Sequence, residues 1–116
     1  MTKDYSKQYD NLSKLMGEMG TKIPETMKAF SEIHAVSIKN SALSSKTKEL
    51  IALGIAITIR CEGCIICHVH DALNSGATSE EIMETIGVAI LMGGGPSVVY
   101  GCEAMEALSQ FIDSKN

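Results

Sequence analysis

The sequence predicts an all-α protein of about six helices, and three observations carry this prediction. Apolar residues recur at three- and four-residue steps in each segment, which is helical periodicity. The chain is 45% hydrophobic but only 4% aromatic, a mix that suits packed helices better than a sheet sandwich. Glycine, proline and capping residues divide the 116 residues into helix-sized segments. The length predicts one domain over residues 1–116.

The first two predicted helices span residues 4–17 and 24–39. Gly17 and Gly20 are expected to end the first helix, and Pro24 suits the first turn of the second. One apolar face of the second helix is formed by Met27, Phe30, Ile33 and His34. A histidine in such a face more often packs than binds a ligand, so His34 is interpreted as a packing residue.

The third and fourth helices are predicted over residues 46–59 and 61–74. Ser44 or Ser45 can cap the third, which is apolar nearly all round and is therefore expected to be the central buried helix. The fourth is followed by Gly76, at the position where a left-handed residue ends a helix.

The last two helices are predicted from their start signals. Thr78 and Glu81 match a capping box, which opens a helix that runs to about Met92. Three glycines at 93–95 break it, and Pro96 opens a sixth helix that ends near residue 113.

Charge and hydropathy exclude several classes of partner. The net charge is −4 and no basic stripe exists, so neither nucleic acid nor an anionic membrane is an expected partner. The first residues are polar rather than a signal peptide, and the longest apolar stretch, 50–59, is too short to cross a bilayer. These observations predict a cytoplasmic location, in which cysteines begin as thiols. The apolar-rich composition also predicts a homo-oligomer.

Three of the four cysteines fall within seven residues, in Cys61-Glu62-Gly63-Cys64-Ile65-Ile66-Cys67-His68-Val69-His70. Such clustering indicates redox or metal chemistry. Cys61 and Cys64, three residues apart at a helix start, can close a disulfide. The helix N-terminus stabilises a thiolate, which favours Cys61 as the reactive thiol. His68 lies four residues after Cys64, which places a base beside that thiol and favours Cys64 instead.

Glu49 is a candidate partner of His68. If the third and fourth helices fold back antiparallel, the two side chains lie within about one helical turn of each other. The carboxylate, directly or through a water, then orients the imidazole. The alternative is a surface carboxylate near the start of a helix.

At this point the residues resemble a known family. Glu49-Leu50-Ile51-Ala52-Leu53, the Cys61–Cys64 motif twelve residues on, His68, and Ala72-Leu73-Asn74-Ser75-Gly76-Ala77-Thr78 look like the alkylhydroperoxidase D / carboxymuconolactone decarboxylase family. Gly94-Gly95-Pro96 and Tyr100-Gly101 resemble the start of that family's next helix. The resemblance covers residues 24–108.

The resemblance implies an alkylhydroperoxidase D-like helical fold that assembles as trimers or hexamers. It implies thiol-dependent reduction of hydroperoxides or disulfides, with an unidentified thiol or dithiol as electron donor. Glu49 and His68 would form a proton relay to the thiols. Cys64 would attack the peroxide, and Cys61 would resolve the sulfenic acid as a disulfide. No cofactor and no bound metal is implied.

Three positions depart from the family pattern or add to it. Gly63 stands where the family often has His or Tyr. Cys67 is an addition that either packs as a small buried hydrophobe or competes with Cys61 for Cys64. His70 is expected at the surface or an interface. Apart from these three positions, Cys102 is expected to be a packed core thiol.

Three other functions compete with the thiol oxidoreductase. A metal or iron–sulfur site would use Cys61, Cys64 and Cys67, completed by His68, His70 or Cys102. A regular helix argues against such a site, because residues three apart differ by about 60° around the helix axis and the three thiolates do not converge on one point. A γ-carboxymuconolactone decarboxylase needs no cysteine pair and would want cations for an anionic lactone, whereas Arg60 is the only arginine. The third alternative is a non-catalytic oligomer whose cysteines only pack.

Overall fold

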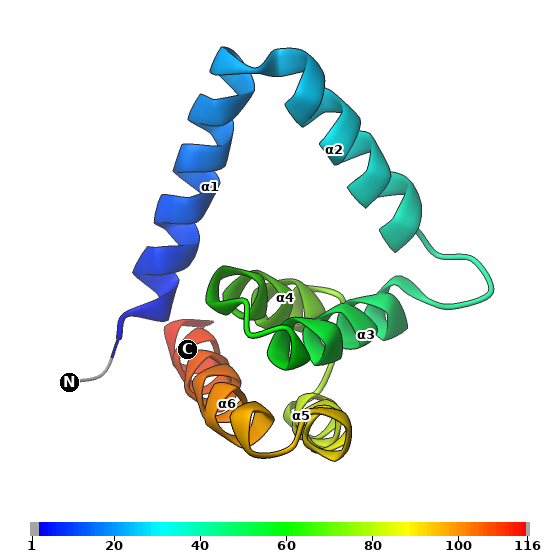
Figure 1. The fold of residues 1–116 in the computed structure, drawn as a ribbon, viewed down its shortest axis with the longest axis vertical. Coiled ribbons are helices and arrows are strands. Elements are labelled where there is room, and N and C mark those ends of the chain that lie inside the picture. The colour runs from blue at the N-terminus through cyan, green and yellow to red at the C-terminus, as the bar shows by residue number, and fades with distance from the viewer. Residues whose placement is uncertain (1–2, 116) are drawn as a thin grey trace.

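The computed structural model describes residues 3–115, and these residues form six helices and no strand (Figure 1). The predicted all-α class and helix number are thus confirmed. The helices are α1 (Tyr5–Lys22), α2 (Pro24–Ile38), α3 (Ser45–Thr58), α4 (Glu62–Asn74), α5 (Ser79–Gly93) and α6 (Gly95–Lys115). None of them is both long enough and apolar enough to cross a membrane, as far as the described residues go.

The helices divide into two regions. Helices α3–α6, here called the body, pack on one another, whereas α1 and α2, here called the arm, form an open hairpin that extends away from it (Figure 1). The buried core comes almost entirely from the body, with Tyr5 as the contribution of the arm. The largest fully buried apolar side chains are Leu53, Ile57, Ile65, Ile66, Val69 and Ile82.

Helix α1 is longer than the sequence predicts. Asp4 caps its start by accepting the Lys7 N–H at 3.0 Å. The helix then continues through Gly17 and Gly20 and ends at Lys22. A glycine inside an exposed helix costs only about 1 kcal/mol, which is too little to end it. The helix stops at Ile23 instead, because Pro24 disfavours the helical conformation of the residue before it.

A tight reversal between α3 and α4 turns the chain back on itself. The Cys61 N–H bonds the Ala56 carbonyl at 3.1 Å, and the Arg60 N–H bonds the Ile57 carbonyl at 3.2 Å. This pair of bonds is a Schellman motif, in which Arg60 adopts the left-handed conformation (φ 61°) that usually falls to glycine. The motif reverses the chain within the three residues 59–61, so α3 and α4 run antiparallel and a side chain early in α3 can meet one late in α4.

The predicted caps around α3, α4 and α5 are confirmed. Ser44 caps α3 by accepting the Thr47 N–H. Gly76 ends α4 with φ 95°, and Thr78 and Glu81 form the capping box that opens α5. These signals are local, since each depends on a few neighbouring residues rather than on tertiary contacts.

The predicted apolar faces exist, but two of them are not buried within the chain. On α2, Phe30 and Ile33 are exposed, and no described residue of this helix is buried. Helix α3 is central, since it packs against α4, α5 and α6, yet its opposite face exposes Ile51 and Ile55. The predicted central helix is therefore central, but it is buried on one side only, because α4, α5 and α6 cover that side.

Candidate thiol site

The cysteine pair lies at the start of α4. Cys61 is the residue that caps this helix, and its Sγ accepts the backbone N–H of Cys64 at 3.3 Å. The two cysteines are joined by a disulfide, with their Cα atoms 5.2 Å apart. The helix therefore begins one residue later than the sequence predicts, at Glu62. Both sulfurs lie where the unpaired N–H groups of a helix end favour a thiolate in the reduced protein.

Glu49 and His68 meet across the antiparallel α3–α4 pair. His68 Nδ1 donates to Glu49 Oε1 at 2.7 Å, and the Glu49 side chain is only 3% exposed. The predicted juxtaposition is confirmed without a bridging water, and the alternative of a surface carboxylate is wrong. Because a carboxylate only accepts hydrogen bonds, the contact assigns the proton to Nδ1 and leaves Nε2 as the nitrogen able to take a proton.

A pocket of about 410 Å³ separates this site from the arm. Its polar and reactive wall includes Cys61, Cys64, Cys67 and His68, and its apolar wall includes Leu12, Met16 and Phe30 of the arm. Gly63 lets α1 approach closely, because a Cβ at that position would lie 3.3 Å from Leu12 Cδ1. A larger residue at Gly63 would therefore require the Leu12 side chain to move by a few tenths of an ångström.

The two remaining cysteines lie in different surroundings. Cys67 is a free, half-buried thiol on the pocket wall, and its pKa is raised by burial first and then by the charges of Asp71 and Glu49. Cys102 is exposed, so its predicted place in the core is wrong. The buried face of α6 includes Ala104, Ala107, Leu108 and Phe111, and Cys102 lies off this helical stripe.

His70 is a packing residue rather than a surface one. Its ring stacks on Tyr9 of the arm with centroids 3.8 Å apart and meets Phe111 edge-on at 5.4 Å. Its Nδ1 also contacts Asp71 Oδ1 at 3.0 Å. Burial, followed by the charge of Asp71, raises the pKa of Tyr9. This cluster attaches α1 to the body beside the pocket.

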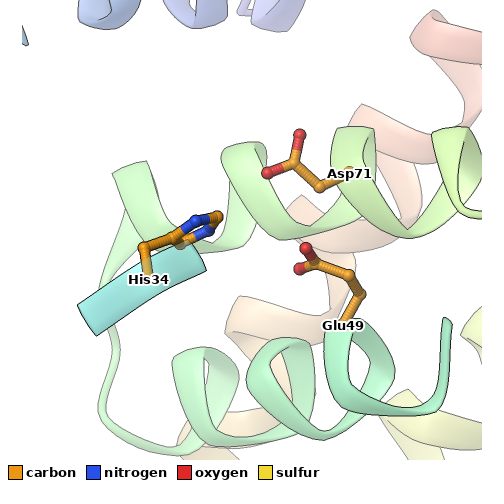
Figure 2. A group of neighbouring side chains, drawn as sticks. All are labelled: His34, Glu49 and Asp71. Atoms are coloured by element: carbon orange, nitrogen blue, oxygen red, sulfur yellow. The ribbon is translucent and has the colours of Figure 1, made fainter. Parts of the chain in front are cut away.

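A second group of polar side chains was not foreseen as a group. His34 of α2, Glu49 of α3 and Asp71 of α4 turn their side chains toward one another (Figure 2), and one ligand atom from each lies within 4.8 Å of the others. The prediction that His34 packs in an apolar face is wrong, because this residue is exposed. No spacing along the chain signals this group, because it depends on where the arm returns to the body.

Comparison with known proteins shows which family has this arrangement of helices. The family model described as the carboxymuconolactone decarboxylase family matches residues 24–107. The chain belongs to the carboxymuconolactone decarboxylase family. A solved structure of a family member from Legionella pneumophila is 39% identical and covers 92% of this chain and 96% of its own, with a TM-score of 0.89. The alkylhydroperoxidase D-like fold expected from the sequence is thereby confirmed.

Two further relatives extend the comparison. An uncharacterized protein of Haemophilus influenzae is 34% identical over 109 residues, which is 94% of this chain and 96% of that protein. A Thermotoga maritima structure shares the fold at 24% identity, with a TM-score of 0.84 over 94% of this chain and 96% of its own. The similarity of this carboxymuconolactone decarboxylase family chain thus spans the arm as well as the body.

Proposed function

We propose that this protein is a thiol oxidoreductase that reduces hydroperoxides or disulfides through Cys61 and Cys64. The observation that carries the proposal is the arrangement of α4, which holds a cysteine pair at its start and His68 one turn later, bonded to a buried Glu49. Family membership is consistent with an enzyme of this kind.

With a hydroperoxide as substrate, the chemistry runs in two steps at the cysteine pair. The Cys64 thiolate attacks the terminal peroxide oxygen, so the O–O bond breaks, the alcohol leaves with a proton, and Cys64 becomes a sulfenic acid. The Cys61 thiol then attacks the Cys64 sulfur and displaces water, which gives the Cys61–Cys64 disulfide. An external thiol or dithiol donor returns both sulfurs to the reduced state by thiol–disulfide exchange.

His68 and Glu49 supply the proton handling for these steps. His68 lies one turn along α4 from Cys64, and both residues line the pocket. Its Nε2 is the nitrogen that remains available for a proton. It accepts the thiol proton and delivers it to the departing alcohol. Glu49 is a positioning residue, because its carboxylate fixes the ring orientation and stabilises the imidazolium that forms.

The pocket favours this function over lactone decarboxylation. Among the described residues, those that line it include no lysine or arginine, whereas Asp71 contributes a carboxylate. The single arginine, Arg60, is exposed in the α3–α4 turn. An anionic lactone would therefore meet negative charge, while the apolar arm residues suit the hydrocarbon part of an organic hydroperoxide.

The decisive experiment is to trap the sulfenic acid in variants that lack one cysteine of the Cys61–Cys64 pair. Cys61→Ser combined with Cys67→Ser, which prevents Cys67 from reacting with the sulfenic acid, is treated with one equivalent of an organic hydroperoxide and dimedone. It should carry the adduct on Cys64, as read by peptide mass spectrometry. Cys102→Ser is the matched control, since Cys102 is exposed and away from the pocket, and it should still form the Cys61–Cys64 disulfide. An adduct on Cys61 in Cys64→Ser and none on Cys64 would reverse the two roles. Absence of adduct and of disulfide in all variants would refute the proposal.

A further inference from the structure

We propose that His34, Glu49 and Asp71 form a binding site for a divalent first-row transition-metal cation, with Zn²⁺ as the representative ion. The three side chains come from three different helices, α2, α3 and α4, and converge on one point beside the pocket (Figure 2). The site contains no cysteine and shares only Glu49 with the relay proposed above, and its proposal does not depend on the thiol chemistry.

The donor atoms fit such a cation. One imidazole nitrogen and two carboxylate oxygens are the ligands that Zn²⁺, Mn²⁺ and Fe²⁺ accept. Metal bonds near 2.1 Å place tetrahedral ligand atoms about 3.4 Å apart. The present atoms lie within 4.8 Å of one another, so small side-chain rotations close the site. His34 is exposed and free of tight packing, and can make most of that adjustment.

The charge around the site also favours a cation. Glu49 and Asp71 bring two carboxylates together, and Glu49 is buried, where like charges repel strongly. Among the lysine and arginine side chains of residues 3–114, the ion pairs are with Glu62, Glu103 and Glu81, and none is with Glu49 or Asp71. A bound cation would compensate this local excess of negative charge.

Each carboxylate has a second partner that orients it. Glu49 Oε1 accepts from His68 and Asp71 Oδ1 contacts His70 Nδ1. A carboxylate has two oxygens, so either group can bind a cation and keep its histidine. Hydrogen-bonded ligands of this kind are the usual outer support of protein metal sites. The open side of the site faces the pocket, since His34 and Asp71 both line it.

The test must exclude binding by thiolates, which also attract Zn²⁺. Isothermal titration calorimetry with ZnCl₂ is therefore carried out on the full chain with all four cysteines replaced by serine, and is repeated on the oxidised wild-type protein. We expect one Zn²⁺ per chain in both. His34→Ala and Asp71→Asn should each weaken binding by at least about tenfold, since losing a ligand exceeds losing an outer partner. Asp10→Asn, on exposed α1, is the control and should bind like its parent.

A second readout follows the arm. Because His34 belongs to α2, a bound cation ties this helix to α3 and α4. Amide hydrogen exchange in residues 24–38 should slow when Zn²⁺ is added to the cysteine-free parent, and should not slow in its His34→Ala derivative. Saturable binding that is unchanged by His34→Ala, or the absence of a one-to-one complex in both proteins, would overturn the proposal. A larger loss in His70→Ala than in His34→Ala would also overturn it.

Discussion

The arm and the body are built from helices of similar length, but only the body buries a continuous apolar stripe of each helix within the chain. The body buries one stripe of each helix in a shared core, as Leu53 and Ile57 do on α3. The arm buries Tyr5 alone and leaves Phe30, Ile33 and Val36 of α2 in contact with solvent. The difference teaches that an amphipathic pattern predicts a helix and an apolar face, but not whether the same chain covers that face.

The largest expected difference between the two regions is in the free energy of unfolding that is lost when an apolar side chain is truncated. Leu53→Ala in the body removes a fully buried side chain and should lower the free energy of unfolding by about 2–5 kcal/mol. Ile33→Ala in the arm removes an exposed one and should change it by less than about 0.5 kcal/mol under conditions that keep the chain monomeric. Urea unfolding followed by circular dichroism measures both, and equal losses would remove the distinction.

The exposed arm face leads to a prediction about assembly. We propose that the protein is a homo-oligomer, a trimer or a hexamer, in which a second copy covers the apolar face of α2. Sedimentation velocity at micromolar concentration should give a multiple of the 12.4 kDa chain mass. Phe30→Gln combined with Ile33→Gln should lower that mass while the helix content stays the same. A wild-type monomer would contradict the proposal that a second copy covers the apolar face of α2.

The proposed relay of His68 and Glu49 lies entirely in the body, so we expect its loss to change the reactivity of Cys64. With Cys61, Cys67 and Cys102 replaced by serine, His68→Ala should slow the reaction of Cys64 with iodoacetamide at pH 7 by roughly tenfold, the effect of one unit of thiol pKa. Glu49→Gln should slow it less, because it acts through the imidazole. His70→Ala is the matched control, since this ring packs on Tyr9. A larger effect of His70→Ala than of His68→Ala would refute the relay.

The smallest expected effect concerns the two free cysteines of the body, Cys67 on the pocket wall that faces the arm and Cys102 on the exposed surface of α6. Burial raises the pKa of Cys67 on the pocket wall, so this thiol stays protonated at pH 7, and its thiolate fraction grows about tenfold per pH unit below that pKa. In the oxidised protein, iodoacetamide should therefore label exposed Cys102 before Cys67 at pH 7, with the difference narrowing as pH rises. Peptide mapping between pH 7 and 10 measures the labelling of the two cysteines. Preferential labelling of Cys67 at pH 7 would contradict the prediction.

Features that depend on near neighbours in sequence were predictable. The Gly76 stop and the Thr78–Glu81 capping box need only a few residues, and both are present. The meeting of Glu49 with His68 was also within reach, because a short turn between two helices leaves few choices of register. Local signals and one antiparallel pair therefore placed the core of the candidate site.

Features that depend on which elements meet in space were not predictable. The exposure of Cys102 follows from which side of α6 the other body helices cover. The grouping of His34 with Asp71 follows from the angle at which the arm returns to the body. The extra length of α1 has a different cause, since two glycines inside a helix are a weaker stop than the proline at Pro24.

The capping role of Cys61 has a practical consequence for mutagenesis of this helix. A cysteine that receives the Cys64 N–H serves the fold as well as the chemistry. Alanine at this position would remove both roles at once, and a lost helix cap costs about 1 kcal/mol by itself. Serine keeps an acceptor at nearly the same place and is among the preferred capping residues. An alanine scan would therefore overstate the redox importance of Cys61, whereas a serine replacement reports the sulfur alone.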